Sequence, residues 1–345
     1  MGELFVPGRL CLLGEHSDWA AGWRRRAGEL SPGFCLVAGT DQGLRGEAER
    51  SDAFEITSRL ASGEEIGPAR IEARPAALAE AARGADFFSY AAGVAAEMVE
   101  RHGVGGLRLR VAGDLPVRKG LSSSAAICVL VARAFAAAYG VALSWREEME
   151  LAYFGERRTG SECGRMDQVC AYGRRVTFLR FDGDDFAVEP LAAGGPLHLL
   201  IVDLRRGKDT RRILADLNAC FPDTPGALAA GVREVLGPRN AALLAQARSA
   251  VLAGDAAALG ALMREAQALF DAAVAPASPD ELAAPRLHAV LAHPAQRELA
   301  WGGKGVGSQG DGCAQLVTRG PEERARLAAL LERDLDVRCW PLTPG

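Results

Sequence analysis

The chain has 345 residues, of which 49% are apolar and 24% charged, a composition typical of a globular protein long enough for two domains. Its formal net charge of −4 argues against a nucleic acid as the main partner, because phosphate binding needs clustered lysines and arginines. The apolar run around residues 125–131 is too short to span a membrane, and no signal peptide is visible at the N-terminus.

Eight cysteines are scattered along the chain, with no CxxC pair and no paired histidines near them. They stand at positions 11, 35, 128, 163, 170, 220, 313 and 339. Metal sites and disulfide frameworks need closer or more regular spacing. We therefore expect reduced thiols in a cytoplasmic protein, without a structural zinc ion.

The first part of the chain predicts strands separated by glycines and prolines, in the stretches LFVPGRLCLLGE, FCLVAGTD and FEITSRL. Residues 86–101 have helical spacing and end before Gly103. Residues 107–111 alternate between apolar and basic side chains, which predicts a strand with one buried face.

An apolar helix is predicted to follow the serines at 122–124 and to end at Gly140. Ser144 and Glu147 have the spacing of a capping box, which predicts a second helix running to about Arg158. Two further strands are expected, in the stretches VTFLRF and HLLIVDL.

The last part of the chain is predicted to be mainly helical over about 209–295, with one helix start at Ser278 followed by proline. The glycine-rich stretch GGKGVGSQGDG then leads into a strand, CAQLVTR, a helix, PEERARLAALLERDL, and a final strand, VRCWPL. Because strands and helices mix in both halves, we expect an α+β protein. The loop-like AAGGP at 192–196 favours a domain boundary near residue 190.

The stretch KGLSSSAA at 119–126 joins three serines directly to the apolar helix. The first N–H groups of a helix have no partner within it, and the helix dipole adds positive charge there. This end of a helix is therefore suited to a phosphate, and the serine hydroxyls would add donors. The same serines are also consistent with an ordinary helix N-cap, and the stretch alone does not separate the two interpretations.

A second glycine-rich stretch, GVGSQG at 305–310, matches GxGxxG without the expected βαβ context. A dinucleotide site needs a strand before the glycines, a helix directly after them and an acidic residue about twenty positions later. The sequence therefore argues against a Rossmann fold, and it contains no GxxxxGK[ST] loop. Another interpretation is a loop that needs positive φ at several glycines.

The stretch PGRLCLLGEHSDWAAG at 7–22 places four ionisable side chains beside an apolar strand. They are Arg9, Glu15, His16 and Asp18. Taken singly, each charged residue is compatible with a surface ion pair, and the histidine with a core residue whose hydrogen bonds are made within the protein. Because burying such groups is costly, the set favours a site that binds hydroxyl groups.

Together, PGRLCLLGEHSDWAAG, LPVRKGLSSSAA and GGKGVGSQGDGCA resemble the three motifs of the GHMP kinases in order and spacing. The first is similar to the galactokinase form PGRxNLxGEHxDYxxG, and CGRMDQ at 163–168 resembles the CGxMDQ segment that carries the galactokinase base. The resemblance runs from Pro7 to about Val317. It implies an α+β fold with a ribosomal-protein-S5-like N-terminal ATP-binding domain (1–190) and a ferredoxin-like C-terminal domain (191–345), and an active site between them.

The resemblance also implies roles for individual residues. The loop around the ATP phosphates would consist of Lys119, Gly120, Leu121, Ser122, Ser123, Ser124 and Ala125. Ser124 and Glu156 would hold Mg²⁺. Asp167 would be the general base, with Arg9 beside it. The substrate would be contacted by Glu15, His16, Asp18, Gly164, Asp167, Gly305 and Gly307, with Gly310 shaping the third loop.

These roles are compatible with phosphoryl transfer, which depends on positioning and charge neutralisation more than on covalent chemistry. An anomeric hydroxyl is acidic enough to suit a weak carboxylate base beside a permanent cation, and arginine at position 9 matches galactokinase where mevalonate kinase has lysine. We therefore expect an enzyme that phosphorylates the C1 hydroxyl of a monosaccharide such as galactose, arabinose or a uronic acid. The partners would be ATP and the sugar, without nucleic acid or membrane; the sequence does not indicate an oligomeric state.

Three departures from the galactokinase motifs leave the substrate open. Trp19 replaces the family tyrosine, and either a sugar-stacking or a packing role fits it. The basic run Arg205–Arg212, or Arg165, either is solvated or meets a carboxylate or phosphate of the substrate. Gln309 and Asp311 are polar where the family often has small residues.

Other functions agree less well with these residues. A heptose 7-phosphate or a non-sugar alcohol of the mevalonate type would be another acceptor for the same chemistry. A catalytically silent sugar or ATP sensor would be expected to lose the serines or the base, and both are present. A binding module without a nucleotide would leave the three motifs unexplained.

Overall fold

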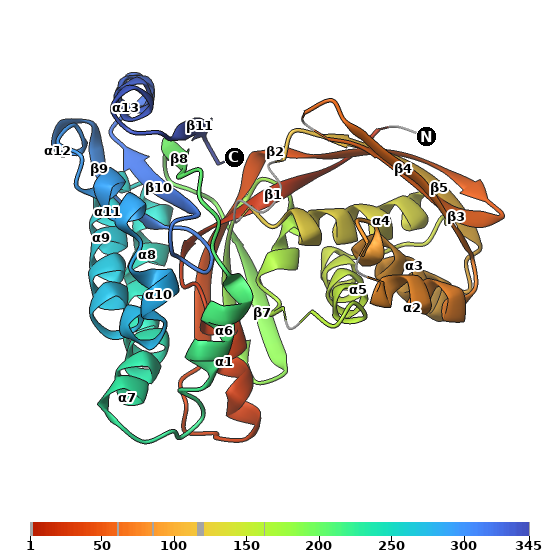
Figure 1. Ribbon diagram of the computed structural model, residues 1–345, viewed down its shortest axis with the longest axis horizontal. Coiled ribbons are helices and arrows are strands. Elements are labelled where there is room, and N and C mark those ends of the chain that lie inside the picture. Colours follow the sequence, from red (N-terminus) through yellow and green to blue (C-terminus); the bar gives the residue numbers. More distant parts are fainter. Residues whose placement is uncertain (1–2, 61, 85, 116–120, 162, 345) are drawn as a thin grey trace. The chain divides into compact units, whose positions relative to one another are not determined.

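The computed structural model describes residues 3–60, 62–84, 86–115, 121–161 and 163–344 (Figure 1). The chain forms two compact units. The first contains the residues up to Arg9 together with Gly39–Arg174, and the second contains Leu10–Ala38 together with the residues from Arg175 onward. Strands β1 (Leu4–Leu13) and β2 (Gly33–Ser51) contribute residues to both units. The domain boundary expected near residue 190 stays a prediction.

In the first unit, helices cover one face of a sheet with the strand order β4-β3-β5-β2 (Figure 1). The strands besides β2 are β3 (Ala53–Arg59), β4 (Glu65–Glu72) and β5 (Gly106–Gly113). The helices are α2 (Pro75–Arg83), α3 (Ser89–His102), α4 (Ser123–Tyr139) and α5 (Trp145–Arg157). Strand β5 alternates as predicted, with Leu107 and Leu109 buried and Arg108 exposed.

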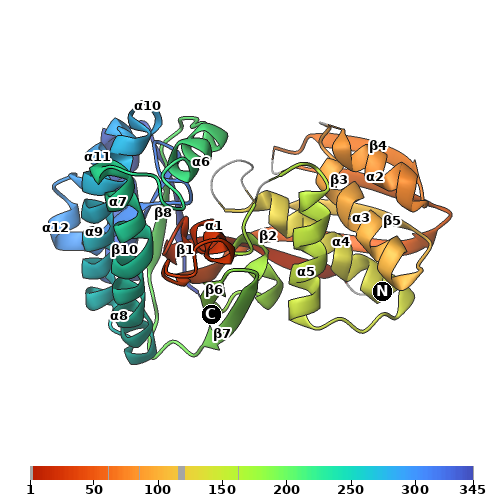
Figure 2. The ribbon, with the colours of Figure 1, turned by 90° about the horizontal axis from the view of Figure 1, so that it is seen from below.

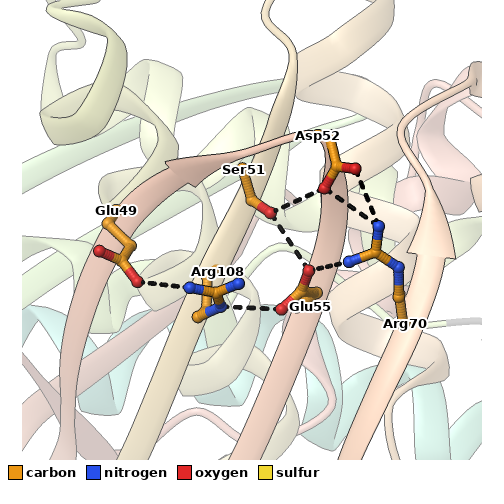
Figure 3. Close-up of polar contacts among 6 residues, drawn as sticks. All are labelled: Glu49, Ser51, Asp52, Glu55, Arg70 and Arg108. Atoms are coloured by element: carbon orange, nitrogen blue, oxygen red, sulfur yellow. Dashed lines mark hydrogen bonds and ion pairs between the residues drawn. The ribbon is translucent and has the colours of Figure 1, made fainter.

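The exposed face of this sheet carries a network of ion pairs (Figure 3). Glu55 lies opposite Arg108 on one neighbouring strand and opposite Arg70 on the other, and it bonds both guanidinium groups. Glu49 and Asp52 complete the network. Solvent and salt screen exposed pairs of this kind, so they make the surface polar and add little to stability.

Helices α3 and α5 meet at a pair of glycines. A Cβ added to Gly93 would lie 2.1 Å from the carbonyl oxygen of Gly155, which is far inside van der Waals contact. The two helix backbones approach this closely only because neither residue has a side chain. Since Glu156 directly follows Gly155, this contact also fixes the end of α5 that carries a candidate site residue.

We expect Gly93→Ala to destabilise the protein by about 1–3 kcal/mol, because the helices must separate or shift. The matched control is Gly231→Ala in α7 (Ala227–Glu234), where the new Cβ would meet its nearest neighbour at an ordinary 3.5 Å. There the higher helix propensity of alanine should raise stability slightly. Urea unfolding of both variants measures the difference, and equal effects would contradict this account.

The second unit contains a four-stranded antiparallel sheet with the order β11-β8-β10-β9. Its strands are β8 (Leu199–Asp203), β9 (Ala300–Gly305), β10 (Cys313–Thr318) and β11 (Arg338–Leu342). The N-terminal part of β2 pairs with β6 (Val176–Asp182), which pairs with β7 (Asp185–Leu191).

Helices make up most of the rest of the second unit. They are α1 (Ser17–Gly22), α6 (Thr210–Asn218), α7, α8 (Asn240–Ala253), α9 (Ala256–Ala273), α10 (Pro279–Leu282), α11 (Pro285–Leu291), α12 (Gln296–Leu299) and α13 (Pro321–Asp334). Helices α8 and α9 lie side by side (Figure 2). One apolar cluster joins the sheet to α11 and α13 through residues such as Leu200, Leu316, Leu287 and Leu331. The α+β fold class is therefore confirmed.

The sequence did not indicate strand β9, which directly precedes the glycine-rich loop. Three of its six residues are glycine, so no apolar alternation marks it. Strand β10 returns antiparallel to β9, so the glycines lie in a hairpin and not in the βαβ unit of a dinucleotide site.

Among the described residues, no helix is both long enough and apolar enough to cross a membrane. All eight cysteines are free thiols in the structure. The cytoplasmic location inferred from them stays a prediction.

Candidate active site

The first unit brings together Arg9 from β1 and Asp167, the first residue of a 3-10 helix (Asp167–Tyr172). Arg9 Nε donates to Asp167 Oδ1 over 3.1 Å, and Nη2 bonds the same oxygen. The arginine side chain is 5% exposed and the aspartate 29%. The backbone of Arg9 also donates to the carbonyl of Leu121 over 3.1 Å, which ties the segment before α4 to β1.

Glu156, near the end of α5, is a second carboxylate beside this pair and is only 3% exposed. Gln168 Nε2 donates to its Oε2 over 2.9 Å. Burial, followed by the negative charge of Asp167, raises the pKa of Glu156 to about 7, while hydrogen bonds from Gln168 and Ser124 and the charge of Arg9 oppose this. Glu156 is therefore a buried carboxylate whose surroundings carry too little positive charge to balance its own negative charge when it is ionised.

Helix α4 begins at Ser123, so it includes two of the three serines that the sequence predicted to precede it, and Ser122 lies before it in the left-handed conformation with φ 54°. The Ser122 side chain makes no capping bond to this helix. Leu121 and Ala125 are buried and anchor the turn. Ser124 bonds Glu156, so the start of α4 and the end of α5 meet at one point.

These residues fit a magnesium ion bound with a nucleotide. Mg²⁺ prefers hard oxygen ligands and keeps several waters and phosphate oxygens, so a serine and a carboxylate suffice. Among the described residues, no three His, Cys, Asp or Glu side chains gather as a self-sufficient metal site. The excess negative charge at Glu156 is what a bound divalent cation would neutralise, with Ser124 and Glu156 as its protein ligands.

In the second unit, Glu15 forms a buried ion pair with Lys304 of β9. Lys304 Nζ also donates to the carbonyl of Gly305 over 2.8 Å. Gln315 lies opposite Lys304 in the β9–β10 ladder and donates to the carbonyl of Cys11 over 2.6 Å. One face of the sheet thus holds the segment from Cys11 to Glu15 through two buried polar side chains.

His16 is buried in the left-handed conformation with φ 68° and stacks on Phe270 at a centroid distance of 6.1 Å. Its Nδ1 accepts a hydrogen bond of 3.1 Å from Trp19 Nε1. Its Nε2 has no side-chain partner among the described residues, and the backbone of Ser308 lies beside the ring. Burial, then the positive charges of Lys208 and Lys304, lowers the pKa of His16 to about 3, so the ring is neutral at physiological pH.

The glycine-rich loop after β9 is fixed by side chains from other elements. Lys208 Nζ donates to the carbonyl of Val306 over 3.0 Å and to that of Gln309. Asp311 Oδ1 accepts from the backbone N–H groups of Arg286 and Leu287, each over 2.9 Å, at the start of α11. Asp311 is therefore a helix cap, and Lys208 of the basic run supports the loop.

Three other basic residues singled out in the sequence have protein partners. Arg165 pairs with Glu150 at 3.3 Å and lies over the Tyr153 ring. Arg205 pairs with Asp336 at 3.0 Å, and Arg212 with Asp280 at 2.7 Å. These pairs account for the three arginines without a substrate anion.

The structure therefore groups the expected residues in two sets. In the first unit, Arg9, Ser124, Glu156 and Asp167 come together, with Leu121, Ser122, Ser123 and Ala125 at the adjoining start of α4. In the second unit, Glu15 and His16 lie with Gly305 at the loop that also contains Gly307, and Asp18 lies in the first turn of α1. Gly164 lies in the segment just before the 3-10 helix Asp167–Tyr172, and Lys119 and Gly120 lie outside the described residues.

Sequence reasoning missed Gln168 and Lys304. Gln168 lies within CGRMDQ, but the motif does not indicate that its amide bonds Glu156. Lys304 stands in a glycine-rich stretch that suggests a flexible loop, and only the strand pairing shows that its side chain is buried. A single lysine between glycines was the one available signal.

We expect Lys304→Met to destabilise the protein by about 3–5 kcal/mol, because it leaves the Glu15 carboxylate buried without its counter-charge. Arg205→Met is the control, since the Arg205–Asp336 pair is 58% and 68% exposed and should cost about 1 kcal/mol or less. Chemical unfolding at pH 7 compares the two. Similar losses in both variants would show that Lys304 does not balance a buried charge.

Comparison with known proteins agrees with the fold and with the family resemblance of the sequence motifs. Residues 89–174 match the family model described as GHMP kinases N terminal domain. The chain is 29% identical to the galactokinase of Thermococcus kodakarensis over 203 residues, which cover 58% of this chain and 52% of that protein. It is 27% identical to the galactokinase of Streptococcus suis over 221 residues, covering 61% and 51%. The chain thus matches about half the length of these curated relatives.

Solved structures are similar over nearly the whole chain. Lactococcus lactis galactokinase complexed with galactose has a TM-score of 0.72 at 18% identity and covers 99% of this chain and 93% of its own. L. major mevalonate kinase in complex with R-mevalonate has a TM-score of 0.74 at 18% identity and covers 100% and 96%. The fold is therefore that of the GHMP kinases. Residues 89–174 are similar to the N-terminal domain of that superfamily, and the curated relatives of the chain include galactokinases.

Proposed function

We propose that this protein is a kinase that transfers the γ-phosphoryl group of Mg-ATP to the anomeric hydroxyl of a monosaccharide. The observation that carries the proposal is the group formed by Arg9, Asp167, Glu156 and Ser124 in the first unit. It combines a carboxylate that can accept a proton, a fixed cation, and a second carboxylate with a hydroxyl for a metal ion. Phosphoryl transfer needs these components.

In this proposal Asp167 takes the proton of the attacking hydroxyl. The carboxylate is more exposed than the arginine, so it can meet a substrate while Arg9 keeps it oriented. Ser124 and Glu156 hold magnesium, which neutralises charge on the phosphate oxygens when it is bound. The stretch Lys119–Ala125 lies around the phosphates, with the N–H groups at the start of α4 directed to them.

The second unit supports a sugar as the acceptor. Glu15 offers carboxylate oxygens that accept hydrogen bonds, and His16 is a neutral ring with one nitrogen that has no side-chain partner among the described residues. Such groups suit hydroxyl-rich ligands. The fold resembles mevalonate kinases as much as galactokinases, so it does not discriminate between acceptors. The curated sequence relatives named above are galactokinases, which favours the sugar.

The test is ADP release from Mg-ATP with neutral aldoses, uronic acids, heptose phosphates and mevalonate as acceptors. Turnover with one sugar and phosphate on its C1 oxygen would support the proposal. Turnover only with mevalonate, or phosphate on a non-anomeric oxygen, would overturn it. ATP binding without turnover on any acceptor would favour the sensor.

A further inference from the structure

His16 has two ring nitrogens in very different situations. Nδ1 lies 3.1 Å from Trp19 Nε1, whereas Nε2 is buried and has no side-chain partner among the described residues. An indole N–H can donate a hydrogen bond and cannot accept one. Nδ1 must therefore offer its lone pair to Trp19, and the ring proton of neutral histidine must be on Nε2.

The surroundings of His16 reinforce this form of the ring. The charged side chains that act on it are Lys208 and Lys304, both positive, which lower its pKa. A hydrogen bond between the ring and the Ser308 backbone raises the pKa and opposes them only in part. A doubly protonated imidazolium would place an N–H against the N–H of Trp19 and a positive charge beside two lysines. Geometry and charge both favour a neutral ring that carries its proton on Nε2.

We infer that Trp19 is a positioning residue that fixes His16 as the Nε2–H tautomer, so that His16 presents a hydrogen-bond donor to the substrate. Glu15, the preceding residue, is an acceptor only. Glu15 would therefore bind a substrate hydroxyl that donates a hydrogen bond, and His16 would bind a substrate oxygen that accepts one. The statement about the substrate rests on the proposed function, but the tautomer itself does not.

A packing role is the main competing explanation for Trp19. Its ring meets Phe221 edge-on at a centroid distance of 5.4 Å and borders the apolar cluster around Ile213 and Leu217. Trp19→Phe keeps an aromatic ring there and removes the N–H. Trp23→Phe is the matched control, because Trp23 borders the same cluster and donates its own N–H to Asn218 Oδ1 over 3.1 Å.

The decisive experiment is ¹⁵N NMR of the histidine rings in the full chain without ligand, with the His16 signals assigned by their loss in His16→Gln. We expect the native protein and the control Trp23→Phe to show a single Nε2–H tautomer of His16 that does not titrate between pH 5 and 8. Trp19→Phe should show both neutral tautomers, still without titration in this range, because burial and the two lysines are unchanged. An unchanged His16 spectrum in Trp19→Phe, or an Nδ1–H tautomer in the native protein, would overturn the inference.

A kinetic measurement tests the consequence for the substrate, using D-galactose first and then the other panel sugars. Loss of one oriented hydrogen bond should raise KM about five- to tenfold in Trp19→Phe, with kcat changed less than about twofold. A fall in kcat at constant KM would contradict a role in sugar binding. If the native protein phosphorylates no sugar, the proposed function fails, while the NMR result still decides the role of Trp19.

Discussion

Asp167→Asn is expected to lower the rate of ADP formation by about 10²–10⁴-fold while leaving the protein folded and able to bind Mg-ATP. The amide has the shape of the carboxylate but cannot take a proton from the attacking hydroxyl. It can still accept a hydrogen bond from Arg9 through its oxygen, so the position of the side chain should be kept. The fall should therefore appear in kcat, with KM for ATP little changed.

Asp182→Asn provides the matched control. Asp182 is 29% exposed, as Asp167 is, and it also accepts a hydrogen bond from an arginine, Arg24, over 2.5 Å. This variant removes the same charge from an ion pair of the second unit that has no proposed catalytic role. Its turnover should match that of the native protein. Equal activity of Asp167→Asn and Asp182→Asn would exclude Asp167 as the base.

Arg9 connects the two carboxylates of the first unit. It bonds Asp167 directly, and its charge acts on Glu156 as well. Asp167 also raises the pKa of Glu156, so Asp167→Asn should lower the pKa of Glu156 toward its ordinary value. Titration of Glu156 in both proteins would detect this coupling even without a known substrate.

The sequence predicted most of the elements around the candidate site because their local signals are strong. The capping box at Ser144 is formed as expected, and α4 runs from the serines to Gly140. Strand β9 was missed because Gly302, Gly303 and Gly305 remove the alternation that identifies strands. Its position depends on pairing with β10, which is a long-range property that no local pattern records.

The side-chain partners were less predictable than the elements. The motif resemblance implied Arg9 beside Asp167, and the structure places them in contact. It did not indicate the Lys304–Glu15 pair, whose members are 289 positions apart. Nor did it explain Asp311, since a carboxylate capping a helix more than twenty residues earlier depends on the tertiary fold.

Glu156→Gln should stabilise the ligand-free protein above pH 7 and remove part of its pH dependence. The pKa of Glu156 rises from its ordinary value of 4.5 to about 7, chiefly through burial. Between these two values the folded protein holds a proton that the unfolded chain has released. Stability therefore falls as pH rises from about 4.5 to 7, by up to about 3 kcal/mol. Glutamine is neutral at every pH, so the gain in stability of Glu156→Gln over the native protein should be absent near pH 4.5 and complete above pH 7.

Glu148→Gln is the control on the same helix and should act in the opposite direction. Glu148 is 6% exposed but accepts hydrogen bonds from Arg133, so removing its charge leaves a half-buried arginine without its partner and should lower stability at pH 7. Thermal unfolding of both variants and the native protein from pH 4.5 to 8.5, without metal, gives the comparison. Destabilisation by Glu156→Gln at pH 8 would contradict an uncompensated charge at this position.

Glu156→Gln also tests whether Glu156 binds magnesium, separately from its effect on stability. Mg²⁺ binds the ionised carboxylate, so magnesium with ATP should displace a proton and stabilise the native protein more at pH 8 than at pH 6. Glu156→Gln should lose most of this pH-dependent shift and most of its turnover. If magnesium and ATP stabilise both proteins equally at every pH, Glu156 is not a metal ligand, and its high pKa reflects burial alone.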